Sequence, residues 1–141
     1  IPLWLGGGGE KVTLKLVAQF GNGCNIGGGK LDVVQQKLDV LRQHCDKLGR
    51  DFNEIDRSTN LNVFLLEDGE DPVAATAQVR GARSYEDFTR DAFVMTSAQL
   101  TEHISKLVDL GVNYVITYFP RVAYDHTHLK RFASEVMPAF A

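Results

Sequence analysis

The stretch LWLGGGGEK (Leu3–Lys11) places four consecutive glycines between an apolar run and a helical pattern. The apolar run, Pro2 to Leu5, is typical of a strand that is covered on both faces. After the glycines, apolar residues recur at three- and four-residue spacing, which predicts a helix from Glu10 to Phe20 that ends at Gly21. Because a strand and a helix bracket the glycines, we interpret the run as a structured turn and not as a linker or cloning scar.

The same order of strand and helix recurs along the chain. Further strands are predicted over residues 23–26, 58–66 and 112–119, and helices over residues 31–48, 73–94 (with a break near 81–84), 96–110 and 129–140. This alternation is typical of a parallel sheet with right-handed crossovers. The four consecutive βα units therefore predict an α/β fold, either a small doubly wound sheet or half of an eight-stranded barrel.

Composition and charge limit the classes of function. The chain has 141 residues, of which 44% are hydrophobic and 23% are charged, as is typical of a single domain over residues 1–141. No apolar stretch reaches the roughly 20 residues that a membrane span needs. The formal net charge is −3 and no basic stripe is present. Neither a membrane nor a nucleic acid is therefore expected as a partner.

The two cysteines, Cys24 and Cys45, match neither a redox pair nor a zinc pattern. Because both lie among apolar residues, we expect reduced thiols in the core of a cytoplasmic protein, and no metal site. The chain begins at Ile1, on a predicted core strand and without a methionine, from which we expect a fragment.

The glycine turn after the first strand is the main candidate site. In parallel α/β folds ligands bind at the carboxyl ends of strands, and glycines let a ligand approach the backbone closely. The N–H groups at the start of the next helix, together with the side chain of Lys11, favour an anion. The run matches neither of the common glycine-rich nucleotide-binding patterns. An anion site and a plain turn therefore both stay open.

Other residues near strand ends have plainer interpretations. The glycines at 27–29 favour a tight loop, and Asn25 is interpreted as either a ligand contact or a turn cap. The spacing of His126 and His128 favours exposed residues at a helix start over a metal pair. The remaining histidines, His44 and His103, are expected on the surface. Three residues at the end of the last strand are expected at the rim where a ligand would bind: Tyr118, Phe119 and Arg121.

No pair of nucleophile and base stands out in the sequence, and no residue is predicted to be catalytic.

Three segments resemble the luciferase-like monooxygenase superfamily, and within it the F420-dependent oxidoreductase branch. They are PLWLGGGGEKVTLKLVAQFGNGCN (2–25), KLDVVQQKLDVLRQHCDKLGRDFNEI (30–55) and MTSAQLTEHISKLVDLGVNYVITYFP (95–120). Asn22 stands where the family more often has aspartate, Phe52 where it has proline, and Met95 where it has glycine. The resemblance covers nearly the whole chain and is weakest over residues 68–94.

The resemblance implies the C-terminal half of a TIM barrel, strands five to eight, that binds F420 or, as an alternative, FMN. In the family, backbone amides of the glycine turn and of the following helix start hold the cofactor phosphate. Carried over to this sequence, these positions are Gly7, Gly8, Gly9 and Glu10, with Lys11 as a weaker addition. The family's first half supplies the ring pocket and the groups nearest hydride transfer. The resemblance therefore implies part of an oxidoreductase that acts on a small-molecule substrate and is inactive alone.

A half-barrel leaves two strand edges exposed. We therefore expect copies of the chain to form a homo-oligomer through these edges. Two other functions stay open: a non-catalytic, self-associating half-barrel and a small phosphate-binding α/β module.

Overall fold

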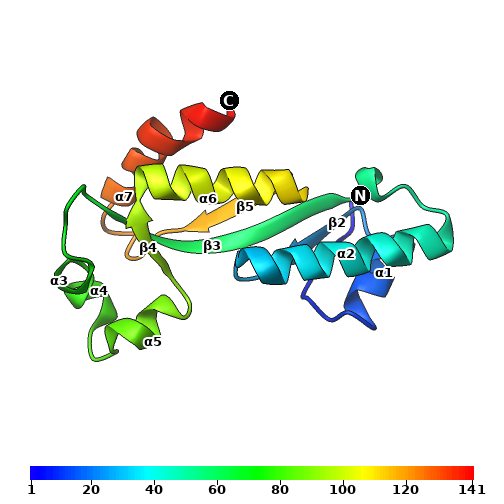
Figure 1. The fold of residues 1–141 in the computed structure, drawn as a ribbon, viewed down its shortest axis with the longest axis horizontal. Helices are drawn as coiled ribbons and strands as arrows, with labels where there is room; N and C mark the ends of the chain where they lie inside the picture. Colours follow the sequence, from blue (N-terminus) through cyan, green and yellow to red (C-terminus); the bar gives the residue numbers. More distant parts are fainter. The chain divides into compact units, whose positions relative to one another are not determined.

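The computed structural model describes all residues from Ile1 to Ala141, and strands and helices alternate along the chain (Figure 1). The strands are β1 (Trp4–Gly6), β2 (Gly23–Ile26), β3 (Asp56–Leu66), β4 (Phe93–Thr96) and β5 (Tyr114–Tyr118). The longer helices are α1 (Thr13–Phe20), α2 (Leu31–Leu48) and α6 (Ser97–Leu110), and the short ones are α3 (Pro72–Ala75), α4 (Ala77–Arg80), α5 (Tyr85–Thr89) and α7 (Thr127–Arg131). None of the helices combines the length and the apolarity that crossing a bilayer requires.

The chain forms two compact units, which are described separately below. Unit 1 comprises Ile1–Asn60 and Ser105–Ile116, and unit 2 comprises Leu61–Ile104 and Thr117–Ala141. Strand β3 contributes to both, because its first residues pair with β2 in unit 1 and its last residues pair with β4 in unit 2. Both pairings are parallel, and β5 also pairs with β3. The predicted α/β class and parallel sheet are confirmed.

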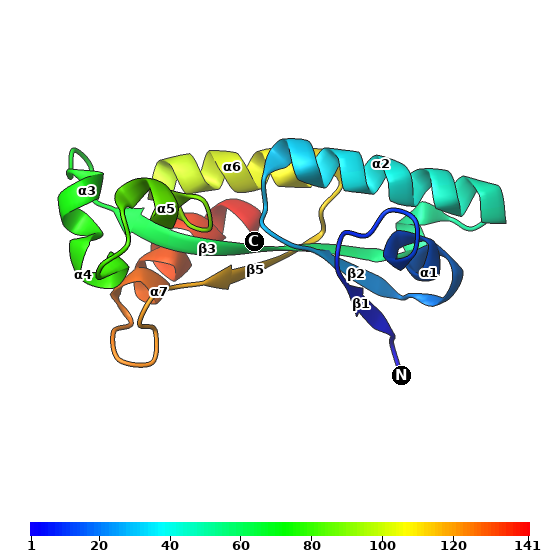
Figure 2. The same cartoon turned by 90° about the horizontal axis from the view of Figure 1, so that it is seen from below.

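In unit 1, α1 and α2 pack against each other, and α2 runs along one face of β2 (Figure 2). Both helices bury the apolar stripe that their spacing predicts, because that stripe faces the strands and the neighbouring helix. The buried members are Leu14, Val17 and Ala18 of α1 and Val34, Leu38, Leu41 and Cys45 of α2. Helix α2 ends at Gly49, whose φ of 65° lies in the left-handed region that favours glycine.

Two arginines satisfy backbone carbonyl groups of unit 1. The guanidinium of Arg50 donates hydrogen bonds to three carbonyl oxygens at the carboxyl end of α1: Val17, Ala18 and Gly21. Arg57 on β3 is only 8% exposed. It donates to three other carbonyl oxygens: Phe52, Ile55 and Gly111. Both side chains thereby place a positive charge among backbone carbonyl acceptors, as the carboxyl end of a helix favours.

In unit 2, α6 begins with the capping box predicted from the spacing of Thr96 and Gln99. The Thr96 N–H donates to Gln99 Oε1 (2.9 Å) and the Gln99 N–H donates to Thr96 Oγ1 (3.3 Å). Arg131 at the end of α7 forms ion pairs with Glu67 (2.9 Å) and Glu135 (3.1 Å). These pairs tie α7 to the loop that follows β3.

The helix predicted over residues 73–94 is wrong in its last part. The break near residues 81–84 is confirmed, because α4 ends at Gly81 (φ 56°) and Ser84 caps α5. Beyond α5, however, the chain forms β4, which pairs with residues 63–66 of β3. The local pattern of apolar residues in β4 is compatible with either a helix or a strand. Hydrogen-bonded pairing with β3 stabilises the strand. The structure therefore has five strands, one more than the four expected.

The apolar face predicted for the last helix is only partly correct. Val136 is buried, whereas Leu129 and Phe140 are each 42% exposed. The backbone changes from α7 to a π-helical turn over Phe132–Val136 and then to a 3-10 turn over Met137–Phe140. Residues spaced for 3.6 residues per turn no longer share one face after these changes.

Close approach of two strands explains the glycine at position 23. A Cβ added to Gly23 would lie 2.6 Å from atoms of the Trp4 ring, which covers Gly23 from the paired position on β1. Any side chain at this position would therefore push the indole off the sheet.

We expect Gly23→Ala to lower the free energy of unfolding by about 1–3 kcal/mol because of this overlap. Urea unfolding followed by the fluorescence of Trp4, the only tryptophan, measures the change. Gly6→Ala is the matched control, since a Cβ on Gly6 meets no atom within 4 Å. Equal midpoints for the two variants would contradict the assignment.

Candidate functional site

The glycine turn leaves the carboxyl end of β1 in unit 1. The N–H of Gly7 donates to the carbonyl oxygen of Asn25 on β2 (3.0 Å), and Gly7 has a φ of 117°, which favours glycine. Helix α1 begins at Thr13 and not at Glu10 as predicted, because residues 10–12 form a separate turn. The first helical turn is therefore displaced by three residues from the glycines.

The backbone donors of this turn are not used by the protein itself. The N–H groups of Gly8, Gly9, Glu10 and Lys11 donate no hydrogen bond within the chain. A Cβ on Gly9 would lie 2.9 Å from Thr13 Oγ1, so a side chain at this position would displace the turn or the start of α1. The turn thus presents consecutive free N–H groups, an arrangement suited to an anion.

Helix α2 holds the turn through Glu10. The Glu10 carboxylate accepts hydrogen bonds from Lys37 Nζ (2.7 Å) and Gln36 Nε2 (2.8 Å). His44 Nε2 lies 2.8 Å from the Glu10 carbonyl oxygen. His44, expected as a surface residue, therefore helps to hold the candidate site. The hydrogen bond and charge of Lys37 lower the pKa of the Glu10 carboxyl from its ordinary value.

The ion pair also affects the charge that a ligand would meet. Because Lys37 compensates the negative charge of Glu10, this carboxylate does not oppose an anion as a lone acid would. Lys11 is exposed beside the turn. The aliphatic part of Lys37 packs against Gly8, where an added Cβ would lie 3.3 Å from Cε. Sequence pattern offered no signal for Lys37, which lies 27 residues from Glu10.

A second polar feature lies next to the turn. The side-chain oxygen of Asn25 is buried and has no hydrogen-bond donor. Asn25 pairs with Gly6 on β1 and with Ser58 on β3, so its side chain shares a sheet face with the last residue before the turn. A buried acceptor without a partner is costly, which favours a ligand or water donor at this point. Of the two interpretations of Asn25, this geometry favours the ligand contact.

The loop after β2 is a tight turn, as expected. Gly28 and Gly29 both have positive φ values, 86° and 57°. Gly27 lies beside Asn60, whose Oδ1 would be 3.4 Å from an added Cβ.

The cysteines are buried thiols, as expected, and neither forms a disulfide. Burial raises the pKa of the Cys24 thiol to about 11 and also raises the pKa of Cys45. Both side chains are therefore protonated at neutral pH and unsuited to nucleophilic attack.

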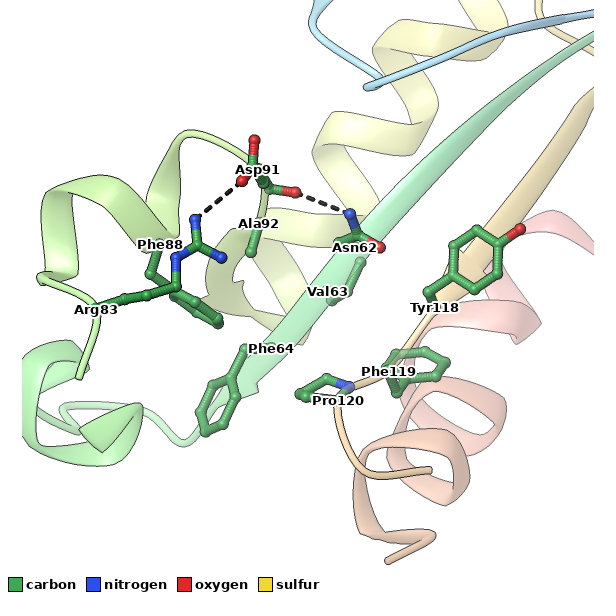
Figure 3. A pocket seen from close by; sticks show the side chains of 10 residues that line it. All are labelled: Asn62, Val63, Phe64, Arg83, Phe88, Asp91, Ala92, Tyr118, Phe119 and Pro120. Carbon is green, nitrogen blue, oxygen red and sulfur yellow. Dashed lines mark hydrogen bonds and ion pairs between the residues drawn. The ribbon is translucent and has the colours of Figure 1, made fainter. Parts of the chain in front are cut away.

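In unit 2, a pocket of about 220 Å³ lies over the second half of β3 (Figure 3). Its lining comes from β3, from the segment around α5 and from the end of β5. The residues are Asn62, Val63, Phe64, Arg83, Phe88, Asp91, Ala92, Tyr118, Phe119 and Pro120. Two of the three residues expected at the ligand rim, Tyr118 and Phe119, line this pocket. Arg121, the third, does not line it and has a φ of 58°.

Sequence reasoning missed most of this pocket. Four lining residues, Arg83, Phe88, Asp91 and Ala92, fall in the segment for which a helix was predicted. Their shared position depends on the chain reversal between α5 and β4, which no local pattern specifies.

His128 is wrongly predicted as exposed. Its ring packs on Phe64 with 4.5 Å between centroids, and its Nδ1 is buried without a hydrogen-bond partner. Burial lowers the pKa of the imidazole from its ordinary value, partly offset by the nearby negative charge of Asp125. His126, by contrast, is exposed as predicted.

The lowered pKa predicts a pH dependence of stability. Since the folded state favours neutral His128, stability is present above the unfolded-state pKa of about 6.5 and is lost as the pH falls below it. We expect His128→Phe to lose less stability than the native chain between about pH 7 and about pH 5. Thermal unfolding at both pH values measures the difference. His126→Phe is the control and should keep the native pH dependence; an identical loss in the His128 variant would refute the assignment.

Comparison with solved structures relates this geometry to known proteins. The chain superposes on an F420-dependent tetrahydromethanopterin reductase from Methanopyrus kandleri with a TM-score of 0.71 and 17% identity, covering 100% of this chain and 51% of that chain. It also superposes on a monooxygenase from Streptomyces bottropensis with a TM-score of 0.72 and 18% identity, covering 99% of this chain and 48% of that chain. A third match is the oxygenating constituent of a Baeyer-Villiger monooxygenase of Pseudomonas putida, in complex with FMN. Its TM-score is 0.60 at 13% identity, and the match covers 99% of this chain and 48% of that chain.

These likenesses concern the fold. The chain spans about half the length of each of the three structures. No protein-family profile matches it, and neither does any curated protein. The expected resemblance to the TIM-barrel fold of luciferase-like F420- and flavin-dependent oxidoreductases is confirmed.

Proposed function

We propose that this chain is the C-terminal part of an F420- or FMN-dependent oxidoreductase of the luciferase-like type, and that its glycine turn binds the cofactor phosphate. The free N–H groups of the turn carry the proposal. The N–H groups of Gly8, Gly9, Glu10 and Lys11 form a row of donors that the chain itself does not use. We name F420 first because the sequence resembles the F420-dependent branch of the superfamily, and FMN is the alternative cofactor.

The electrostatics of the turn support an anionic ligand. Lys11 adds an exposed positive charge, and Lys37 offsets the charge of Glu10 at 2.7 Å. Gly7 has the other role of closing the turn back onto β2 through its hydrogen bond to Asn25. Gly7 therefore shapes the turn, while the residues that follow it face the ligand.

The bound cofactor would supply the hydride chemistry, and the protein would bind and orient it. No residue of this chain is assigned as catalytic. The small-molecule substrate and a cytoplasmic location are parts of the same proposal. The two buried, reduced thiols agree with such a location.

Titration of the chain with F420 and with FMN, followed by absorbance, tests the cofactor. We expect Gly8→Val and Gly9→Val each to weaken binding at least tenfold, on the order of 1.4 kcal/mol or more. The added side chains would collide with Lys37 and Thr13, respectively, and would displace the free N–H groups. Gly6→Ala is the matched control and should bind as the native chain does. Unfolding midpoints of all variants show whether each one folds. Saturable binding that both valine variants retain would show that the turn is not the site, and no binding of either cofactor would overturn the proposal for this chain.

We also propose that two copies of the chain associate through the edge formed by β1. Strand β1 ends the sheet, and β2 is its only neighbour. Leu3 and Trp4 are 50% and 41% exposed there, and Trp4 contacts the exposed ring of Tyr114 edge to face (5.7 Å between centroids). An exposed apolar edge strand readily pairs with another strand. A self-associating half-barrel without catalysis is the alternative function that this edge favours.

Light scattering across a concentration series tests the association. We expect the native chain to dimerise and Leu3→Lys to shift the equilibrium toward the monomer, because a lysine on an edge strand opposes pairing. Val73→Lys, at a 45% exposed position in unit 2, is the matched control. A native chain that stays monomeric at every concentration would refute the proposed dimer.

A further inference from the structure

We propose that the pocket of unit 2 is a binding site for a neutral, one-ring organic compound that carries a single hydroxyl group. All lining residues belong to unit 2, and none belongs to the glycine turn. The inference therefore does not depend on the proposed cofactor site.

The phenylalanine rings of the pocket pack against neighbouring side chains. Phe64 packs on His128 (4.5 Å between ring centroids), and Phe119 packs on Phe132 (5.5 Å). The guanidinium of Arg83 lies 5.8 Å from the centre of the Phe88 ring. The three phenylalanine walls thus each contact a further side chain, so their rings do not depend on a ligand for their placement. Preformed, mostly apolar cavities of this kind are typical of small-molecule sites.

The charges at the rim are paired, which argues against a charged ligand. Arg83 Nη2 lies 2.9 Å from Asp91 Oδ2 and also donates to the carbonyl oxygen of Asp87 (2.6 Å). Figure 3 shows Arg83 turned toward Asp91 at one side of the pocket. Because Asp91 offsets the charge of Arg83, the rim carries no net charge that would attract an ionic ligand. A neutral molecule leaves this ion pair in place.

One polar group of the lining remains for a ligand. Asn62 donates from Nδ2 to the carbonyl oxygen of Asp91 (3.0 Å), which orients its amide and leaves Oδ1 as an acceptor. The ring of Tyr118 lies on the other side of β3, with its hydroxyl turned away from the other lining side chains (Figure 3). One unpaired acceptor beside apolar side chains suits a ligand with one hydroxyl group.

The volume limits the size of the ligand. The pocket of about 220 Å³ is larger than the roughly 150 Å³ that accommodates benzene. It is smaller than the roughly 300 Å³ at which sites for drug-sized ligands begin. One six-membered ring with a short substituent fits between these limits.

The probe for the test is 4-fluorobenzyl alcohol, whose fluorine signal in NMR reports binding to the full chain. We expect saturable binding with a Kd of about 1 mM or tighter, as suits a ligand of so few atoms. The charged analogue 4-fluorobenzoate should bind at least about tenfold more weakly, because its carboxylate would lose hydration at a rim without net charge. Equal or tighter binding of the benzoate would overturn the assignment of a neutral ligand.

Ala92→Leu fills the pocket, since the methyl group of Ala92 points into it (Figure 3), and should weaken binding at least about tenfold. Ala92→Val is the milder variant if the leucine variant does not fold. The matched control is Ala74→Leu, at an exposed position of α3, which should bind as the native chain does. Absence of saturable binding to the native chain, or full binding by a folded Ala92 variant, would overturn the proposal. Because no cofactor takes part, this failure is distinct from failure of the cofactor site.

Discussion

The parallel pairing of β3 is the constraint on which both units depend. A strand inside a sheet must satisfy its N–H and C=O groups along the ladder, and β3 does so with β2 near its start and with β4 near its end. In unit 1 this pairing sets Asn25 beside Ser58, and the pairing of β2 with β1 sets Asn25 beside Gly6. In unit 2 it makes β3 the floor of the pocket. Each candidate site is built against a part of the same strand.

The two candidate sites differ in the physical nature of their recognition groups. The glycine turn offers backbone donors and lysine charges, with side chains kept away by glycine. The pocket offers aromatic side chains that pack against neighbouring side chains, with its rim charges paired. The first arrangement suits a phosphate and the second a neutral ring. An oxidoreductase that binds a phosphorylated cofactor and an organic substrate requires both kinds of surface.

The glycine turn was predictable from the sequence, whereas the contacts that hold it were not. The turn itself was predictable, because glycines between a strand and a helix are a local signal. Its support by α2 was not predictable, because Glu10, Lys37 and His44 meet only after the helices pack. The start of α1 at Thr13 was also missed, since the hydrogen bonds of residues 10–12 depend on that same packing. The phosphate-binding role of the turn stays a prediction.

The sequence by itself determined the alternation of strands and helices, the buried stripes of α1 and α2, and the capping box of α6. These features follow from side-chain periodicity and local hydrogen bonding, which depend only on residues close together in the sequence. Only the tertiary structure decided that Phe93–Thr96 is a strand, that the ring of His128 packs on Phe64, and that Arg83 and Tyr118 line one pocket. The physical reason is that each of these depends on a partner distant in the chain, and a local pattern does not specify which distant residue will supply that partner.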